Sequence, residues 1–349
     1  MAWVQFLRVF FIDKNTHATR MCMLYLDSST LPLLQKNKNL LAFSAGIDST
    51  ALFFLLLENS ISFDIALVNY KMRPESDKEE AYAKKLAKRY GLQCYITKAP
   101  KFESHFEKSA REFRYDFFDS LIVKYNHQNL ITAHQLNDQL EWFLMRLTKG
   151  AGTVELLGLE SVSKRKNYHL LRPLLHHSKK ELLAYLKSHN YAYFVDSSNS
   201  NERFERNYFR HNFSDKLIDK YQEGILKSFS YLREDKKILT KGYKEIFHQK
   251  ELYVLEFENE YLKIRLADRY LKKLGYLLSS AQREELTKEN SIVFGGEWAV
   301  EFVDNRLFIA PYCQTVIPKK EKERYRMAKI PPKVRGYCYL NKIDITDKV

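Results

Sequence analysis

The sequence predicts an α/β fold: a mostly parallel sheet with helices on both faces, followed by a helical linker and a small α+β domain. Between about residues 39 and 195, short apolar runs of strand length alternate with longer stretches of helical period. Such alternation is typical of parallel sheets covered on both sides. Around residue 215 the alternation stops, and a Lys-rich helical stretch leads into shorter elements.

Individual elements of the sheet domain follow from local patterns. Apolar runs predict strands at residues 40–43, 63–70, 93–97 and 130–133. Helical patterns occupy residues 49–58, 77–90, 106–125 and 138–148. Gly91 is suited to cap the second of these helices at its C-terminus. Ser178 and Glu181 form a capping box that predicts a further helix, ending near residue 189.

The remaining segments predict the domain organisation. Met21 and Met23 are alternative starts, so residues 1–20 are treated as an N-terminal extension and residues 21–215 as the sheet domain. Residues 216–250 are expected to form a helical linker, and residues 251–349 an α+β domain. Short strands and one helix are expected within 251–310, including a hairpin that turns at Asp304-Asn305. The dense charge run at 318–329 is expected to be solvated.

Composition restricts the class of protein. The 349 residues carry a net charge of +14, with an isoelectric point near 9.3. A polyanion, with nucleic acid first, is therefore the expected partner, although a general Lys-rich bias explains the charge equally well. None of the four cysteines forms a CxxC pair, which argues against zinc, Fe–S or thioredoxin chemistry and favours a reducing, cytoplasmic compartment. No apolar run reaches the roughly 18 residues of a membrane span.

The loop from Ser44 to Thr50 is the most informative segment. It joins an apolar strand to an apolar helix, and the first N–H groups of a helix carry partial positive charge and no intrahelical partner. Gly46 allows close backbone approach to a phosphate, and Asp48 would hold Mg²⁺ beside it. The Walker pattern is absent. The alternative is that these Ser and Asp side chains merely cap the helix.

Three further segments accompany this loop. One follows the second strand (Lys71–Ser76), one follows the fourth strand (Thr132–Gly152), and one combines Arg172–Leu175 with residues 196–211. In order and spacing, the whole set resembles the tRNA(Ile)-lysidine synthetase family of N-type ATP pyrophosphatases. That family carries SGGxDS, DHGLRxxS-like, AHxxDDQxET, LxRLxRGxG, RPLL and RFxRN-like motifs. The resemblance extends from about Leu40 to His211 and, more weakly, into the tail.

The resemblance implies a Rossmann-like sheet and a particular reaction. The family uses ATP and Mg²⁺ to adenylate O2 of cytidine 34 in the CAU anticodon of tRNA(Ile), releasing pyrophosphate. The ε-amine of free L-lysine then attacks C2 and displaces AMP. The product, lysidine, pairs with adenine, so that the tRNA reads AUA instead of AUG. On this resemblance the tail domain is expected to bind tRNA.

The resemblance also assigns roles to residues. The loop residues Ser44, Ala45, Gly46, Ile47, Asp48 and Ser49 would hold the nucleotide and its leaving pyrophosphate. Asp48 and Asp138 would hold Mg²⁺, and Glu141, which shares a helix face with Asp138, would assist with metal or lysine. Arg73 would bind phosphate or the adenylate, and His134 the nucleotide. The alternatives are a solvated Arg73, a core His134 and an exposed carboxylate pair.

A second group is expected to contact RNA. Arg111 and Arg114 share a helix face, and Arg146 lies in the Thr132–Gly152 segment. Arg203, Asn207 and Arg210 recur at i, i+4 and i+7 and predict one polar helix face. Among nearby aromatics, Phe204 and Phe209 are expected to be core residues rather than RNA contacts. A surface helix with Glu partners is the alternative for Arg111 and Arg114.

The chain departs from the family pattern at several positions. Ala45 replaces the first loop glycine, at a cost of about 1 kcal/mol if that position needs a positive φ. Asn69 and Tyr70 stand where the family often has Asp-His, and Gln135 and Asn137 replace a His and an Asp. The metal ligands are therefore open. A cytidine thiolase and a non-catalytic tRNA-binding homologue are the rival functions. The oligomeric state is open, with a homodimer among the alternatives.

Overall fold

The computed structural model describes residues 24–71, 75–102, 106–195 and 205–345. Contacts divide the chain into two compact units, residues 1–229 and 230–349. The predicted extension at residues 1–20 lies outside the described residues. No helix in the described ranges is both long and apolar enough to cross a membrane.

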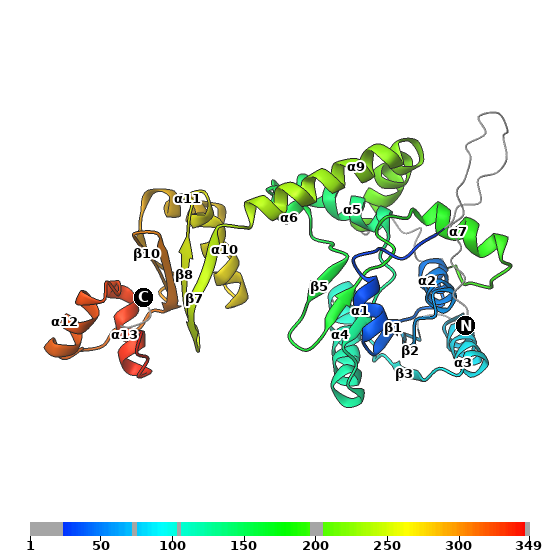
Figure 1. The fold of residues 1–349 in the computed structure, drawn as a ribbon, viewed down its shortest axis with the longest axis horizontal. Helices are drawn as coiled ribbons and strands as arrows, with labels where there is room; N and C mark the ends of the chain where they lie inside the picture. The colour runs from blue at the N-terminus through cyan, green and yellow to red at the C-terminus, as the bar shows by residue number, and fades with distance from the viewer. Residues whose placement is uncertain (1–23, 72–74, 103–105, 196–204, 346–349) are drawn as a thin grey trace, which may run out of the picture. The chain divides into compact units, whose positions relative to one another are not determined.

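A six-stranded sheet forms the centre of the first unit, in the order β3-β2-β1-β4-β6-β5 (Figure 1). The strands are β1 (Asn39–Ala42), β2 (Phe63–Asn69), β3 (Cys94–Lys98), β4 (Asn129–Ile131), β5 (Val162–Lys164) and β6 (His169–Leu171). All neighbouring pairs are parallel except β5 with β6. The predicted α/β class with a mostly parallel sheet is confirmed.

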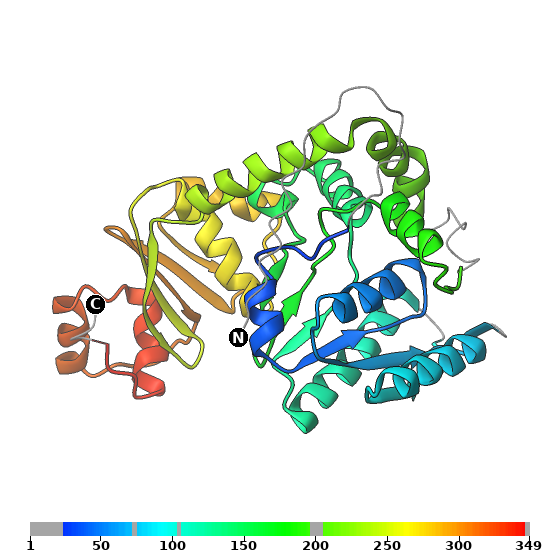
Figure 2. The ribbon, with the colours of Figure 1, turned by 45° about the vertical axis from the view of Figure 1, so that its right-hand side comes forward.

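Helices cover both faces of this sheet because successive strand residues point to opposite sides. Leu41 packs on one face with α2 (Ile47–Glu58), α3 (Glu75–Tyr90) and α7 (Lys179–Ser188). Leu40 packs on the other face with α4 (Phe106–Tyr125). Figure 2 shows this layered arrangement. The short α1 (Leu31–Lys36) precedes β1.

Several helices that follow β4 in the chain pack around α5 (Leu136–Leu147). They are α6 (Thr153–Leu156), α8 (Glu205–Phe209) and the π-helix η2 (Arg210–Ser214). The long helix α9 (Asp215–Leu239) follows η2. A capping box in which Gln135 and Asp138 exchange hydrogen bonds with the backbone starts α5. Of the predicted polar helix face, Asn207 lies in the α-helix α8 and Arg210 begins the π-helical turn, whereas Arg203 lies outside the described residues.

The second unit contains a five-stranded antiparallel sheet in the order β7-β8-β11-β10-β9. Its strands are β7 (Tyr243–Gln249), β8 (Leu252–Phe257), β9 (Ser291–Phe294), β10 (Trp298–Val303) and β11 (Arg306–Pro311). Helices α10 (Leu262–Lys273) and α11 (Ser280–Lys288) pack on one face. The opposite face carries α12 (Lys319–Met327) and α13 (Pro332–Leu340).

Two expectations for this part of the chain are corrected and two are confirmed. Residues 243–249 form β7 instead of the end of a helical linker, because pairing with β8 overrides the helix propensity of a Lys- and Glu-rich stretch. A bulge at Glu245 also breaks the alternating pattern that marks a strand. Residues 251–310 hold two helices, not one. The charge run at 318–329 is solvated as expected: it forms α12, whose charged side chains reach solvent while Tyr325 is buried. The hairpin at Asp304-Asn305 is confirmed.

A buried carboxylate caps α13 from a strand beneath it. Glu301 in β10 is 2% exposed and accepts hydrogen bonds from the backbone N–H groups of Lys333 and Val334 at 2.8 and 3.2 Å, and from Ser291 Oγ at 2.7 Å. Its charge lies at the positive end of the helix dipole. This side chain therefore joins α13 to the sheet.

Glu301→Ala should lower the free energy of unfolding by about 2 kcal/mol, because buried N–H groups lose a charged acceptor. Glu301→Gln, which keeps one acceptor oxygen, should lower it less. Chemical denaturation followed by circular dichroism measures both. Glu256→Ala, at an exposed position of β8, is the control and should change stability by less than about 0.5 kcal/mol. Equal effects at both positions would contradict this role.

Candidate functional site

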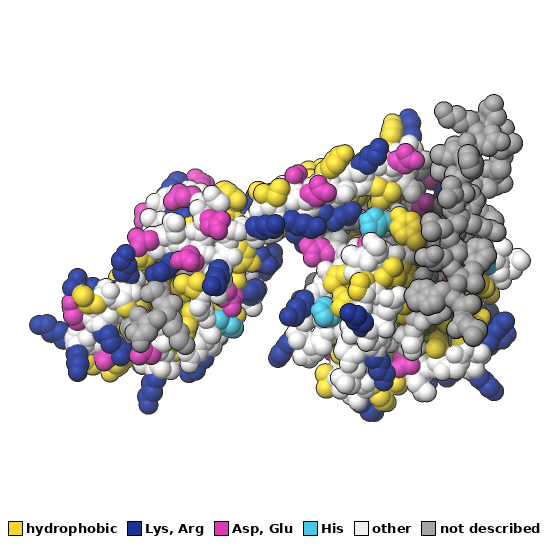
Figure 3. Space-filling view, in the orientation of Figure 1, with side chains coloured by type: hydrophobic (Ala, Val, Ile, Leu, Met, Phe, Trp, Pro, Cys, Tyr) yellow, Lys and Arg dark blue, Asp and Glu magenta, His cyan; other side chains and the backbone are white. Residues whose placement is uncertain are grey.

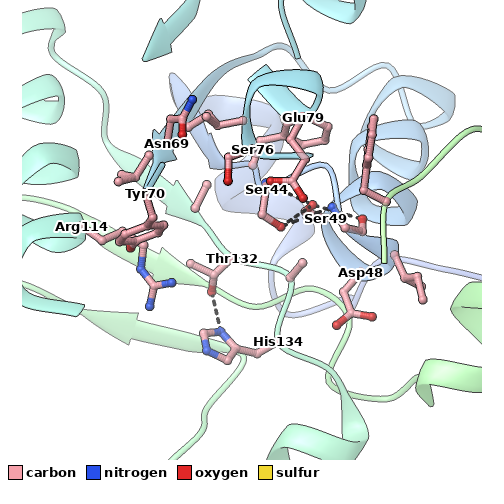
Figure 4. Close-up of a pocket in the computed structure, with 18 of the residues that line it drawn as sticks. Ser44, Asp48, Ser49, Asn69, Tyr70, Ser76, Glu79, Arg114, Thr132 and His134 are labelled. Carbon is pink, nitrogen blue, oxygen red and sulfur yellow. Dashed lines mark hydrogen bonds between the residues drawn. The ribbon is translucent and has the colours of Figure 1, made fainter. Parts of the chain in front are cut away.

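A cavity of about 440 Å³ opens at the carboxyl ends of β1, β2 and β4 (Figure 4). The chain leaves β1 toward β2 and β3 on one side and returns to β4 on the other, so the cavity lies where the strand order reverses. Ligands of open α/β sheets bind at such switch points. The convergence of the loops after Phe43, Tyr70 and Ala133 is the geometric reason for the site.

The loop between β1 and α2 leaves the helix N-terminus free. The N-cap residue is Gly46, and no side chain accepts a hydrogen bond from the first turn. The hydroxyl oxygens of Ser44 and Ser49 lie 3.1 Å apart on the cavity wall. The alternative that these Ser and Asp residues serve as N-caps is therefore wrong. The uncapped N–H groups and two hydroxyls form a cradle for phosphate oxygens.

Ala45 adopts a left-handed backbone conformation, with φ of +60°. The loss of the family's glycine at this position is therefore a loss where a positive φ is required. An L-residue with a Cβ pays about 1 kcal/mol in this region. The conformation is held by a hydrogen bond of 2.9 Å from the Phe194 N–H to the Ala45 carbonyl. Ala45 is itself fully buried and does not line the cavity. Its part in the site is to turn the loop.

Asp48 lies on the first turn of α2 and lines the cavity. Its Oδ1 atom is buried and has no hydrogen-bond partner in the described part of the chain. Burial, together with the nearby Asp138 carboxylate, raises the pKa of Asp48 to about 7, while Lys179 and Arg210 oppose the shift. A buried carboxylate oxygen without a partner is a group that a cation would satisfy.

Asp138 and Glu141 on α5 are buried and paired with two arginines. Arg206 donates to Asp138 Oδ1 at 2.6 Å and to Glu141 Oε2 at 2.9 Å. Arg210 donates to Glu141 at 2.6 and 3.0 Å. The arginines lower the pKa of Asp138 against its burial, whereas burial raises that of Glu141. The alternative of an exposed carboxylate pair is wrong, since the Glu141 side chain has no exposed area.

Asp48 and Asp138 fit a divalent cation that takes its remaining ligands from water or substrate. Asp48 and Asp138 both line the cavity. No group of three or more His, Cys, Asp or Glu side chains suited to metal binding occurs within the described ranges. Mg²⁺ commonly uses one or two carboxylates and completes its octahedron with water and substrate phosphates. Asp48 and Asp138 could therefore hold a Mg²⁺ ion whose other ligands come from water and a polyphosphate.

His134 and Arg114 form the wall opposite the loop (Figure 4). His134 Nδ1 lies 2.9 Å from Thr132 Oγ1, and burial lowers its pKa to about 4. The imidazole is therefore neutral near pH 7 and can accept or donate a hydrogen bond without charge. Arg114 comes from α4, and its guanidinium lies 6.0 Å from the Tyr115 ring centre.

Other residues singled out in the sequence lie away from the cavity wall. Arg111 and Arg146 are exposed, and each stacks on an aromatic ring of its own helix, Tyr115 at 4.9 Å and Trp142 at 4.5 Å. Asn207 lies on α8 beside Arg210, with 3.5 Å between Asn207 Oδ1 and the guanidinium. Arg73, Arg203 and Phe204 lie outside the described residues.

Comparison with known proteins assigns the chain to a family. A PP-loop domain family matches residues 15–217. The chain is 47% identical to a tRNA(Ile)-lysidine synthase of Campylobacter jejuni strain RM1221, covering 90% of this chain and 97% of that protein.

The chain belongs to the tRNA(Ile)-lysidine synthase family.

Two further relatives of the same name support this: that of Wolinella succinogenes (45% identity, 89% of this chain, 95% of the relative) and that of Helicobacter pylori strain 26695 (40%, 88% and 90%).

The departures from the tRNA(Ile)-lysidine synthase pattern have local explanations. Asn137 points away from the cavity: its amide donates to Asp215 at 2.6 Å and its oxygen accepts from the Lys179 N–H. Asn69 donates to Asp77 and Glu80 at 3.1 and 2.8 Å, where a carboxylate would meet two others. Gln135 is the N-cap of α5. Of these three, only Asn69 lines the cavity, and its amide is occupied.

Three residues near the site were not singled out in the sequence of this family member. Lys179 begins α7 and lines the cavity, Glu79 of α3 lines it near the loop, and Arg206 pairs with both α5 carboxylates. The capping box at Ser178 predicted where α7 begins, but it could not predict that the side chain of Lys179, the first residue of α7, lines the cavity. Arg206 lies i−4 from Arg210, and that spacing is the signal that could have found it.

Replacing Asp48 by Asn should stabilise the protein without ligand while abolishing ATP consumption. Because its folded pKa lies near 7 and the unfolded value near 3.8, ionised Asp48 destabilises the fold increasingly from about pH 4 to pH 7. One unit of pKa corresponds to about 1.4 kcal/mol, so this cost is at most about 4 kcal/mol.

Thermal unfolding of wild type and Asp48→Asn at pH 5 and pH 8 measures the effect. The gain from the substitution should be larger at pH 8. Ser49→Ala, on the same turn of α2, is the control and should show no such pH dependence. A gain that shrinks with rising pH would contradict the raised pKa.

Proposed function

We propose that this chain ligates L-lysine to C2 of cytidine 34 in the CAU anticodon of tRNA(Ile), converting ATP to AMP and pyrophosphate. The observation that carries the proposal is the uncapped N-terminus of α2, which lines the same cavity as the carboxylates of Asp48 and Asp138 at the switch point of the sheet. Its relatives, at up to 47% identity, are named tRNA(Ile)-lysidine synthases. The modified base would change codon reading from AUG to AUA.

In the first proposed step, O2 of the cytidine attacks the α-phosphorus of ATP, and the bond to pyrophosphate breaks. The N–H groups at the start of α2 and the hydroxyls of Ser44 and Ser49 would receive the leaving pyrophosphate. Mg²⁺, held by Asp48 and Asp138, would neutralise charge on the phosphate oxygens. The neutral His134 and the Arg114 guanidinium would orient the nucleotide from the opposite wall.

In the second step, the ε-amine of lysine attacks C2, and AMP leaves with O2 while the amine gives up a proton. Asp138 and Glu141 would attract this amine. Arg206 and Arg210 pair with both carboxylates; they lower the pKa of Asp138 and oppose the burial that raises the pKa of Glu141, so the two arginines act as positioning residues. For Arg210 this pairing favours a positioning role over the phosphate contact expected from the sequence, because its side chain is only 13% exposed.

The charge distribution supports an RNA partner. Lys and Arg side chains gather along α9 (Figure 3), which carries Lys216, Lys220, Lys227, Arg233, Lys236 and Lys237. Together with the net charge of +14, these residues favour binding to a phosphate backbone. We further propose that residues 251–349 bind tRNA and that the reaction requires Mg²⁺.

Lysine incorporation tests the proposal directly. With ATP and Mg²⁺, labelled lysine should enter tRNA(Ile) with a CAU anticodon, and AMP should form in equal amount. A transcript with C34→U is the control and should accept no label. Binding of tRNA by folded protein without AMP formation would favour the non-catalytic alternative. Label in the control would contradict the assignment of the target base.

Lys179→Met should lower the rate of pyrophosphate release by on the order of 10- to 100-fold, because the phosphates of ATP would lose the proposed contact with the Lys179 ammonium group. Lys179 lines the cavity and lowers the pKa of Asp48 by its charge. The neighbouring Lys180 is 78% exposed and pairs with Asp219, so Lys180→Met is a matched control that should stay within about twofold. Equal losses in both variants would remove Lys179 from the mechanism.

A further inference from the structure

Three aromatic side chains form an exposed cluster on α8 and η2. The ring centres of Tyr208, Phe209 and Phe213 lie 5.7 to 6.0 Å from one another. Tyr208 is 46% exposed and Phe213 is 41% exposed. Phe209, expected to be a core residue, is only partly buried. Large aromatic surface left in water is costly unless something covers it in use.

The π-helical turn is what brings two of these rings together. Tyr208 and Phe213 are five positions apart, which corresponds to about 140° around a regular α-helix and would place the rings on different faces. The i→i+5 bonding of η2 widens the turn, and the Asp215 N–H accordingly donates to the Arg210 carbonyl. The rings then meet at 5.9 Å. Such π-turns occur frequently at functional sites.

The same short helical segment is tied to the catalytic cavity. Arg206 and Arg210 extend from α8 and η2 to the carboxylates of Asp138 and Glu141 at 2.6 to 3.0 Å, and Asp138 lines the cavity. Because the carboxylates of Asp138 and Glu141 are buried and Arg210 is only 13% exposed, the segment cannot shift without unpairing buried charge. The aromatic cluster is therefore held in a fixed relation to the proposed site of chemistry.

We infer that Tyr208, Phe209 and Phe213 form a stacking surface for unpaired bases of an RNA loop. The identity of that RNA rests on the proposed function. Single-stranded bases are recognised by stacking on aromatic rings, and basic side chains hold the accompanying phosphates. The exposed Lys216 and Lys220 on the following turns of α9 supply this charge, and the whole chain is strongly basic. When one base of the loop enters the cavity, its neighbours lose the stacking contact with that base. The aromatic cluster would supply a replacement stacking partner for these neighbours.

The test uses the full-length protein and a hairpin RNA of the CAU anticodon stem and loop, with 2-aminopurine beside C34. Stacking on an aromatic ring quenches this fluorophore. Wild type should quench it, and Tyr208→Ala with Phe213→Ala should abolish the quenching and raise Kd by on the order of 10-fold or more. Tyr208→Phe and Phe213→Tyr keep the rings and should behave as wild type. Val123→Ala, an exposed aliphatic position on α4, controls for loss of apolar surface.

Two outcomes would overturn the inference. One is unchanged quenching and Kd in the alanine variants. The other is a change in the sedimentation of the alanine variants from dimer to monomer without loss of quenching, which would make the cluster a contact between copies of the chain. Lysine incorporation by the same wild-type preparation is measured in parallel. If it is absent while ring-dependent quenching persists, the proposed function fails and the stacking surface stands.

Discussion

Buried negative charge is the constraint on which the site depends. Asp48, Asp138 and Glu141 are crowded at the carboxyl end of a sheet whose interior is apolar. Without compensation, such carboxylates would take up protons instead of remaining charged. Arg206 and Arg210 compensate Asp138 and Glu141, whereas Asp48 keeps an oxygen without a hydrogen-bond partner in the described part of the chain and a raised pKa. The site is thus left with charge that a metal and a phosphate can complete.

This compensation explains why a segment far along the chain belongs to the site. Arg206 and Arg210 follow Asp138 by about seventy residues, and they reach it because α8 and η2 pack on α5. Removing one arginine would leave the other as the single cationic partner of both carboxylates. The π-turn begins at Arg210 and also brings the rings of Tyr208 and Phe213 together. One local distortion therefore serves the cavity and shapes the neighbouring surface.

The unusual residues of this family member are consistent with an intact site. Asn137 accepts from the start of α7 and donates to the start of α9, so it joins three helices. The Asn69 amide donates hydrogen bonds to Asp77 and Glu80 at the end of β2, where an Asp would add a third carboxylate. Ala45 carries the strain of a left-handed backbone, and the buried position of its methyl group offsets part of that cost. None of these substitutions removes Asp48 or Asp138 from the cavity.

The sequence by itself determined the α/β class, the order of most elements, the hairpin at Asp304-Asn305 and the position of the loop from Ser44 to Thr50 between a strand and a helix. These features depend on hydrophobic period and on turn or cap chemistry, which act between residues close in the chain. Tertiary structure alone decided that β7 is a strand, since pairing with β8 outweighs the propensity of a charged segment. It also decided that Lys179 lines the cavity and that Arg210 pairs with Glu141 instead of facing solvent. The direction of a side chain and the partner of a buried charge depend on residues distant in sequence, and no local pattern contains them.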